Sequence, residues 1–244
     1  MRVLILEHDH LSPPGPIAER FAEHGYEIVE QVVVPPDRFG DPNVTFDFPD
    51  PSEFDAIVPM GAPWGAWDDA TIGNWLLPEI DWLRRADREA VPVLGICFGG
   101  QLLARVHGGS VARAPRPEIG WAALWTSRPE IVSPGPWFQF HYDRWVVPPG
   151  AEEIARNSLA SQSFILRRNL AVQFHPELTA AGLLGWINND GKALIEADGQ
   201  DPDILYQHMA AEEDAAAERA HRLVDAFLEH VAGAAAAGRA SERT

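Results

Sequence analysis

Three residues of this chain have the types and the setting that covalent chemistry with a thiol requires. The first is Cys97, the only cysteine, which follows a short apolar run at residues 93–96 and precedes a glycine-rich turn and a helical pattern. This order of strand, turn and helix is typical of a nucleophile elbow, where the side chain stands exposed on a tight turn. The helix that follows favours a thiolate there, because its N-terminus carries the positive end of the helix dipole.

The second and third residues are His175 and Glu177, which follow another apolar run at residues 170–174. An imidazole that accepts the thiol proton, and a carboxylate that orients the imidazole, are the groups that a cysteine nucleophile needs. Taken alone, Cys97 would be interpreted as an ordinary core residue, since free cysteine is among the most buried residue types. The second motif favours a catalytic role instead.

The two motifs together resemble those of a known enzyme family. The segment Gly95-Ile-Cys-Phe-Gly-Gly-Gln101 is similar to the elbow of the class I glutamine amidotransferases, and His175-Pro-Glu177 resembles their H-P-E motif. The resemblance covers most of the chain. It implies an α/β fold, a three-layer sandwich with a mostly parallel, flavodoxin-like central sheet. It also implies that Cys97, His175 and Glu177 form a triad that hydrolyses the glutamine side-chain amide through a γ-glutamyl thioester.

The loop at residues 60–67 resembles the oxyanion loop of this family, usually written G-G-P, with Ala62 in place of the second glycine. An oxyanion is stabilised by backbone N–H groups, so this role needs no particular side chain. We expect the N–H of Ala62, or alternatively that of Gly61, to act together with the N–H of Phe98. The alanine also raises a question about the backbone, because a positive φ would be costly at Ala62.

Three further residues match family positions beside the glutamine pocket. Gln101 matches a glutamine that contacts the amino-acid end of the substrate, and the alternative is that it only caps the helix after Cys97. His141 and Asp143 resemble an H-x-D segment. The favoured interpretation is a hydrogen-bonded pair that fixes a loop, and the alternative is direct contact with the substrate. His141 is also a competing candidate for the base, although the H-P-E motif favours His175.

The remaining pattern predicts one domain over residues 1–232 and a disordered tail over residues 233–244. His8, Asp9 and His10 are expected in a polar loop at the carboxyl edge of the sheet, where such folds place their active sites, with a metal site as the less favoured alternative. Pro78 is expected to divide a helical region or to start its second part, and residues 168–169 to form a tight turn between two strands. The expected strands cover residues 2–7, 26–34, 55–59, 93–96, 110–114, 122–126, 137–141, 161–167 and 170–174. The expected helices cover residues 16–24, 71–89, 101–107, 180–188 and 205–231, with a polar stretch before the last helix.

Composition restricts the partners. A formal net charge of −17 argues against nucleic acids and anionic membranes as partners, and no apolar run approaches membrane-spanning length. The N-terminal segment becomes charged too soon for a signal peptide. A single cysteine excludes an internal disulfide, and a thiol nucleophile needs a reducing compartment, so we expect the cytoplasm.

The acceptor of the ammonia is left open by the sequence. The proposed steps need no metal and no organic cofactor, and the chain contains no P-loop. Family members usually pass ammonia to an ATP-dependent synthetase, so the resemblance implies such a partner. One alternative is a γ-glutamyl hydrolase that uses the same triad on small amides or peptides. Another is a catalytically silent regulatory or binding homologue.

Overall fold

The computed structural model describes residues 1–233, whose centre is one eight-stranded sheet. Its strands are β1 (Arg2–Glu7), β2 (Glu27–Val32), β3 (Ala56–Pro59), β4 (Val93–Ile96), β6 (Trp125–Thr126), β8 (Glu152–Arg156), β9 (Ser161–Leu166) and β10 (Asn169–Val172). Their order across the sheet is β2-β1-β3-β4-β10-β9-β8-β6. Neighbouring strands run parallel from β2 to β10, whereas β9, β8 and β6 each run antiparallel to the strand before them.

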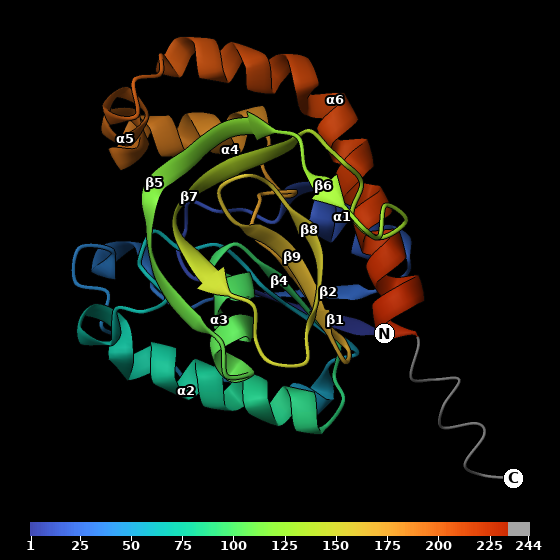
Figure 1. Ribbon diagram of the computed structural model, residues 1–244. Coiled ribbons are helices and arrows are strands. Elements are labelled where there is room, and N and C mark those ends of the chain that lie inside the picture. The colour runs from blue at the N-terminus through green and yellow to red at the C-terminus, as the bar shows by residue number, and fades with distance from the viewer. Residues whose placement is uncertain (234–244) are drawn as a thin grey trace, which may run out of the picture.

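Helices cover both faces of this sheet, as the apolar strands require. In β1, Val3 and Ile5 belong to one buried cluster and Leu4 and Leu6 to the other, because successive side chains point to opposite faces. Helices α1 (Gly15–Glu23) and α6 (Pro202–Ala226) pack on the first face, and α2 (Asp69–Arg88) and α3 (Phe98–Val106) pack on the second. Figure 1 shows α2 and α6 on opposite sides of the molecule. The predicted three-layer α/β sandwich is confirmed.

Helix α2 corrects the expectation that Pro78 divides this region. The helix runs without interruption through Pro78, and the Asp68 side chain caps its start by accepting the Thr71 N–H at 3.1 Å. Trp75 before the proline and Ile80 after it are buried in the same cluster. We attribute the continuity to this packing, which offsets the hydrogen bond that a proline removes from a helix.

A second, separate sheet holds part of the chain that the sequence assigned to several short strands. Strands β5 (Ser110–Ala122) and β7 (Trp137–Val146) pair antiparallel as a ribbon, with a register shift between Arg113 and Glu118. Figure 1 shows this ribbon curving beside the central sheet. Phe138 of the ribbon packs on α4 (Ala180–Trp186) and α5 (Lys192–Ala197). Helix α5 lies in the polar stretch before the last helix, for which no helix was predicted.

The remaining elements are short. They are the 3-10 turns η1 (Pro36–Arg38) and η2 (Pro51–Glu53) and the π-type turns η3 (Ile187–Gly191) and η4 (Phe227–Ala232). The turn between β9 and β10 lies at Arg167 and Arg168, one residue earlier than expected, and Arg167 has a φ of 56°. Residues 234–244 of the predicted tail lie outside the described part of the chain, and the 1–232 domain boundary stays a prediction. No helix within residues 1–233 is both long enough and apolar enough to cross a bilayer.

Candidate active site

Cys97 lies on the sharp turn between β4 and α3. Its backbone has a φ of 50° and a ψ of −103°, a strained conformation for a residue with a side chain. The turn also brings backbones unusually close: a Cβ on Gly99 would lie 2.0 Å from the Pro59 carbonyl oxygen, and one on Gly95 would lie 2.6 Å from the Gly99 oxygen. Gly95 and Gly99 must therefore be glycine, because a side chain at either position would collide with neighbouring backbone. This close packing holds Cys97 where α3 begins.

His175 and Glu177 lie just beyond the end of β10, the strand next to β4. The Nδ1–H of His175 donates to the Glu177 carboxylate at 2.7 Å, and both side chains are buried. Burial lowers the pKa of the His175 imidazole, but the charges of Glu177 and Cys97 raise it more, so the pKa lies well above its ordinary value. The other ring nitrogen, Nε2, is buried and is not held by Glu177, and Cys97 contributes to the raised pKa by its charge and by a hydrogen bond. Nε2 can therefore exchange a proton with a neighbouring group.

Gly61 is the point where these segments converge. A Cβ built on Gly61 would lie 3.2 Å from Cε1 of His175 and 3.9 Å from Cβ of Cys97. A cavity of about 300 Å³ opens over this point. Of the predicted site residues, all but Glu177 line it: Gly61, Ala62, Cys97, Phe98, Gln101, His141, Asp143 and His175.

The loop that carries Gly61 and Ala62 leaves β3 toward this cavity. The Met60 carbonyl accepts the Gly99 N–H at 3.0 Å, which ties the loop to the start of α3. Ala62 does not take a positive φ, so the alanine fits the loop without strain. Within residues 1–233 the N–H of Ala62 makes no hydrogen bond. Phe98 occupies the first position of α3, where the helix itself offers the N–H no acceptor.

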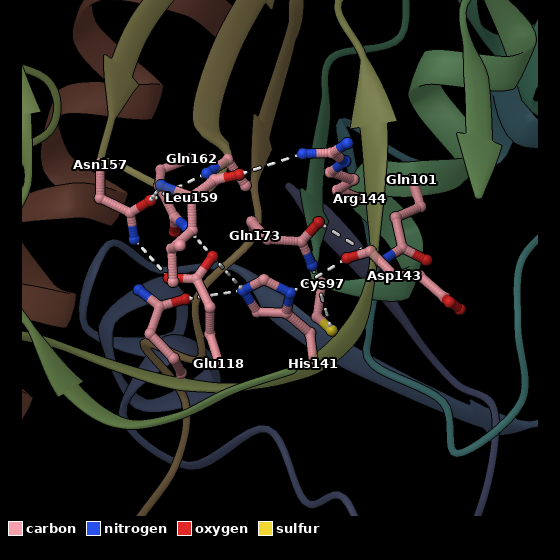
Figure 2. A network of polar contacts seen from close by, with 12 residues as sticks. Cys97, Gln101, Glu118, His141, Asp143, Arg144, Asn157, Leu159, Gln162 and Gln173 are labelled. Atoms are coloured by element: carbon pink, nitrogen blue, oxygen red, sulfur yellow. Dashed lines mark hydrogen bonds and ion pairs between the residues drawn. The ribbon is translucent and has the colours of Figure 1, made fainter. Parts of the chain in front are cut away.

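Two glutamines link α3 to the cysteine. Gln101 donates from Nε2 to Oε1 of Gln173 at 3.3 Å, and Gln173 donates from Nε2 to Sγ of Cys97 at 3.6 Å (Figure 2). Gln101 therefore contacts Gln173 rather than the end of its own helix. The sequence analysis missed Gln173, which is fully buried. The sequence did carry a signal for this role: in an extended segment residues 173 and 175 point to the same side, so Gln173 should lie near the catalytic groups.

His141 and Asp143 lie in strand β7 and not in a loop. The His141 ring contacts the Asp143 backbone oxygen through Nδ1 at 3.0 Å and Gln139 Oε1 through Nε2 at 3.1 Å. Burial lowers the pKa of His141 to about 4 and raises that of Glu118, 3.4 Å from the ring. The ring is therefore neutral with both nitrogens occupied (Figure 2), which argues against His141 as the base. The predicted hydrogen bond between the two residues is present, through the Asp143 backbone oxygen, whereas the predicted loop is wrong, because both residues belong to a strand.

The Asp143 carboxyl group faces the cavity. Burial raises its pKa, while Trp67 and Arg113 oppose the shift. Its Oδ1 atom is buried without a hydrogen-bond partner among the described residues, although Arg113 lies 3.8 Å away. Asp143 is therefore available for a polar group of a bound substrate.

His8 and Asp9 follow β1 at the carboxyl edge of the sheet, as expected, and Asp9 lines the cavity. Both side chains are buried, which the sequence did not indicate. The His8 ring lies between the Gly61 carbonyl and the Glu79 carboxylate, and the His10 ring packs edge-on against Phe39. In the described part of the chain, no group of three or more His, Cys, Asp or Glu side chains is arranged to hold a metal.

Comparison with known proteins gives consistent matches. Residues 73–182 match the family described as glutamine amidotransferase class-I. The chain is 31% identical over 137 residues to a protein of Sulfurisphaera tokodaii that is named as one subunit of a glutamine-hydrolyzing GMP synthase, covering 52% of this chain and 69% of that protein. It is 32% identical over 143 residues to gamma-glutamyl peptidase 4 of Arabidopsis thaliana, covering 52% of this chain and 55% of that protein.

A solved structure extends the likeness to nearly the whole fold. The crystal structure of a glutamine amidotransferase from Thermotoga maritima superposes with a TM-score of 0.79 at 25% identity, covering 94% of this chain and 98% of that one. The chain spans only part of two relatives that are named as glutamine-hydrolyzing GMP synthases: 23% of the length of the Thermomicrobium roseum protein and 19% of the Aeropyrum pernix protein.

Proposed function

Because the chain belongs to the class I glutamine amidotransferase family, we propose that it hydrolyses the side-chain amide of glutamine to glutamate and ammonia. The observation that carries this proposal is the meeting of Cys97 and His175 around Gly61, where Cys97 raises the pKa of the imidazole. A thiol on a strained turn beside an imidazole, which a buried carboxylate holds in one tautomer, is the arrangement that acyl transfer needs.

In the first half of the reaction, Sγ of Cys97 attacks the amide carbon of glutamine while His175 takes up the thiol proton. The oxygen of the tetrahedral intermediate accepts hydrogen bonds from the N–H groups of Ala62 and Phe98. His175 then gives its proton to the amide nitrogen, the carbon–nitrogen bond breaks, and ammonia leaves a γ-glutamyl thioester. In the second half His175 deprotonates a water molecule, which cleaves the thioester and regenerates the thiol. Glu177 keeps the imidazole oriented throughout.

The ammonia acceptor is a separate proposal. The Sulfurisphaera tokodaii relative is named as part of a GMP synthase, and we propose that this chain likewise delivers ammonia to an ATP-dependent synthetase partner. We place the reaction in the cytoplasm, because a thiol nucleophile needs a reducing environment. A pull-down with the full chain, followed by a test of whether the captured protein consumes ATP and ammonia together, examines this proposal.

One observation favours a second candidate, the hydrolysis of larger γ-glutamyl compounds. The cavity of about 300 Å³ has aromatic walls that include Trp64, Trp67, Tyr142 and Trp186. Such walls suit an apolar leaving group, which glutamine lacks. The name of the Arabidopsis thaliana relative, a gamma-glutamyl peptidase, agrees with this candidate.

One experiment tests the proposal and separates the candidates. The purified chain is assayed for glutamate release from glutamine and from γ-glutamyl dipeptides with small and aromatic leaving groups, beside a Cys97→Ala variant whose folding is checked by circular dichroism. We expect glutamine to give the highest kcat/KM and the variant to be inactive. Higher kcat/KM with aromatic γ-glutamyl peptides supports the second candidate, and a wild-type chain inactive on every compound supports the silent homologue.

A further inference from the structure

A buried ion pair lies directly behind the oxyanion loop, outside the triad. His8 follows β1, Glu79 lies in α2, and both side chains are 0% exposed. The ring Nε2 lies 3.1 Å and 3.2 Å from the two carboxylate oxygens of Glu79. Burying such a pair is costly unless its geometry and hydrogen bonding are good, and the mechanism above gives it no role.

The other ring nitrogen of His8 reaches the oxyanion loop. Its Nδ1 lies 3.1 Å from the Gly61 carbonyl oxygen, which can only accept a hydrogen bond, so Nδ1 carries a proton. Nε2 faces the two carboxylate oxygens of Glu79, which turns the ring so that Nδ1 points at the loop. Burial lowers the pKa of His8, but Glu79 and the Gly61 carbonyl raise it more, and the net shift is upward.

This contact fixes the direction of the peptide group that the oxyanion needs. The Gly61 carbonyl and the Ala62 N–H belong to the same peptide unit, and in a trans peptide they point in opposite directions. Holding the carbonyl against His8 therefore points the Ala62 N–H in the opposite direction within the peptide plane, away from His8. Gly61 and Ala62 both line the cavity. A glycine offers little resistance to rotation of this peptide, because it lacks a Cβ, so an external anchor is needed.

Two aromatic rings pack against the His8 ring. Trp75 stacks on it with ring centroids 5.5 Å apart, and the Phe98 ring, tilted by 60°, lies 4.7 Å away. Phe98 also carries the other proposed oxyanion N–H. One buried ring thus contacts the loop that carries the first donor and the residue that carries the second.

We infer that the His8–Glu79 pair is a positioning element of the oxyanion site, in which His8 anchors the Gly61 carbonyl and so directs the Ala62 N–H at the developing oxyanion. The inference rests on the proposed function, because the oxyanion belongs to glutamine hydrolysis. His8 and Glu79 do not line the cavity, so they act through the peptide and not on the substrate.

A matched pair of substitutions tests this role. Asparagine carries its amide nitrogen on Cγ, as histidine carries Nδ1, whereas glutamine carries it one bond further out, where histidine has Nε2. His8→Asn therefore keeps the donor to Gly61, and His8→Gln loses it. Both are made together with Glu79→Gln, so that neither leaves a carboxylate buried without a partner, and both are compared with the Glu79→Gln single variant.

If His8 acts through the oxyanion, its loss should lower kcat and leave KM and the reactivity of the Cys97 thiol nearly unchanged. His8→Gln should lower kcat about 100-fold, the loss typical of one oxyanion donor, and should leave KM within about 3-fold. His8→Asn should recover most of that loss. Alkylation of Cys97 by iodoacetamide forms no oxyanion, so its rate should change less than about 3-fold in either variant. Equal losses in the two variants, or a fall in alkylation parallel to kcat, would show a merely structural role.

A measurement that does not use glutamine keeps this inference separate from the proposed function. The ¹³C resonance of the Gly61 carbonyl should shift in the His8→Gln variant and stay in place in the His8→Asn variant. An unchanged resonance in both variants would overturn the anchoring role. If the wild-type chain does not hydrolyse glutamine, the proposed function fails while the carbonyl resonance still decides whether His8 holds the loop.

Discussion

Adding a single methyl group to Gly61 tests the packing at the centre of the site. In Gly61→Ala the new Cβ would lie 3.2 Å from Cε1 of His175 and 3.8 Å from its Nδ1. Two carbon atoms pack without repulsion at about 3.5–4.0 Å. The imidazole, or the Gly61 peptide, must therefore move by a few tenths of an ångström. The ring has little freedom to do so, because Glu177 holds Nδ1 at 2.7 Å and the Trp186 ring lies edge-on with its centroid 5.0 Å away.

The size of the effect follows from this displacement. A misplacement of about 1 Å costs about 100-fold in rate, so a few tenths of an ångström correspond to roughly 3- to 10-fold in kcat/KM, or about 1 kcal/mol. The free energy of unfolding should change little, because the mild repulsion is offset by the roughly 0.4–1 kcal/mol that alanine gains over glycine in the unfolded chain.

The assay compares glutamate release and thermal unfolding for the wild-type chain, Gly61→Ala and the control Gly40→Ala. A Cβ added at Gly40 would meet no heavy atom within 4 Å, so the control should keep full activity. We expect Gly61→Ala to lose activity with nearly unchanged unfolding. Wild-type kcat/KM in Gly61→Ala would refute the packing of His175 against this loop. A large fall in unfolding temperature would refute the separation of activity from stability.

Three further predictions follow from the same site. The raised pKa of His175 favours the form in which the imidazole already holds the thiol proton, so activity is lost on the alkaline side when that proton leaves. Glu177→Gln removes a charge that raises this pKa and should move the alkaline limb of the kcat/KM profile to lower pH; a limb at unchanged pH would contradict this. Gly99→Ala should lower the free energy of unfolding by several kcal/mol or prevent folding, because its Cβ would lie 2.0 Å from a carbonyl oxygen. Gly185→Ala, with open space around it, should instead stabilise α4 by about 0.5–1 kcal/mol in urea unfolding. Similar effects of the two substitutions would contradict this. Burial lowers the pKa of His141 from 6.5 to about 4, so the folded state binds fewer protons at this residue than the unfolded state. The free energy of unfolding should therefore fall, by up to about 3 kcal/mol, as the pH decreases from 6.5 to about 4. His141→Asn should flatten that decrease, and an unchanged slope would show that other groups cause it.

The sequence was sufficient for the features that depend on local pattern. Apolar runs before Cys97 and His175 placed both at the carboxyl end of buried strands, and parallel neighbours bring such ends to one edge of the sheet. The three-layer architecture followed from the same alternation of strands and helices. These are signals that nearby residues carry by themselves.

The features that the sequence did not reveal depend on partners far along the chain. His8 was expected in a polar loop at the carboxyl edge of the sheet, but its burial and its contact with Glu79 could not be predicted, because Glu79 lies 71 residues away. Gln173 had no predicted role, since its contact with Cys97 depends on how β10 and β4 pair. Pro78 signals a break locally, whereas the packing of α2 on the sheet overrides that signal.

The central claim is that Cys97 forms a covalent γ-glutamyl thioester, and mass spectrometry of acid-quenched enzyme tests it most directly. The full chain is mixed with glutamine, quenched within a turnover, digested and mapped. We predict a mass increase equal to one γ-glutamyl group on the peptide that contains Cys97, and no increase in Cys97→Ala. Glutamine hydrolysis by Cys97→Ala, or an adduct on another residue, would contradict the account.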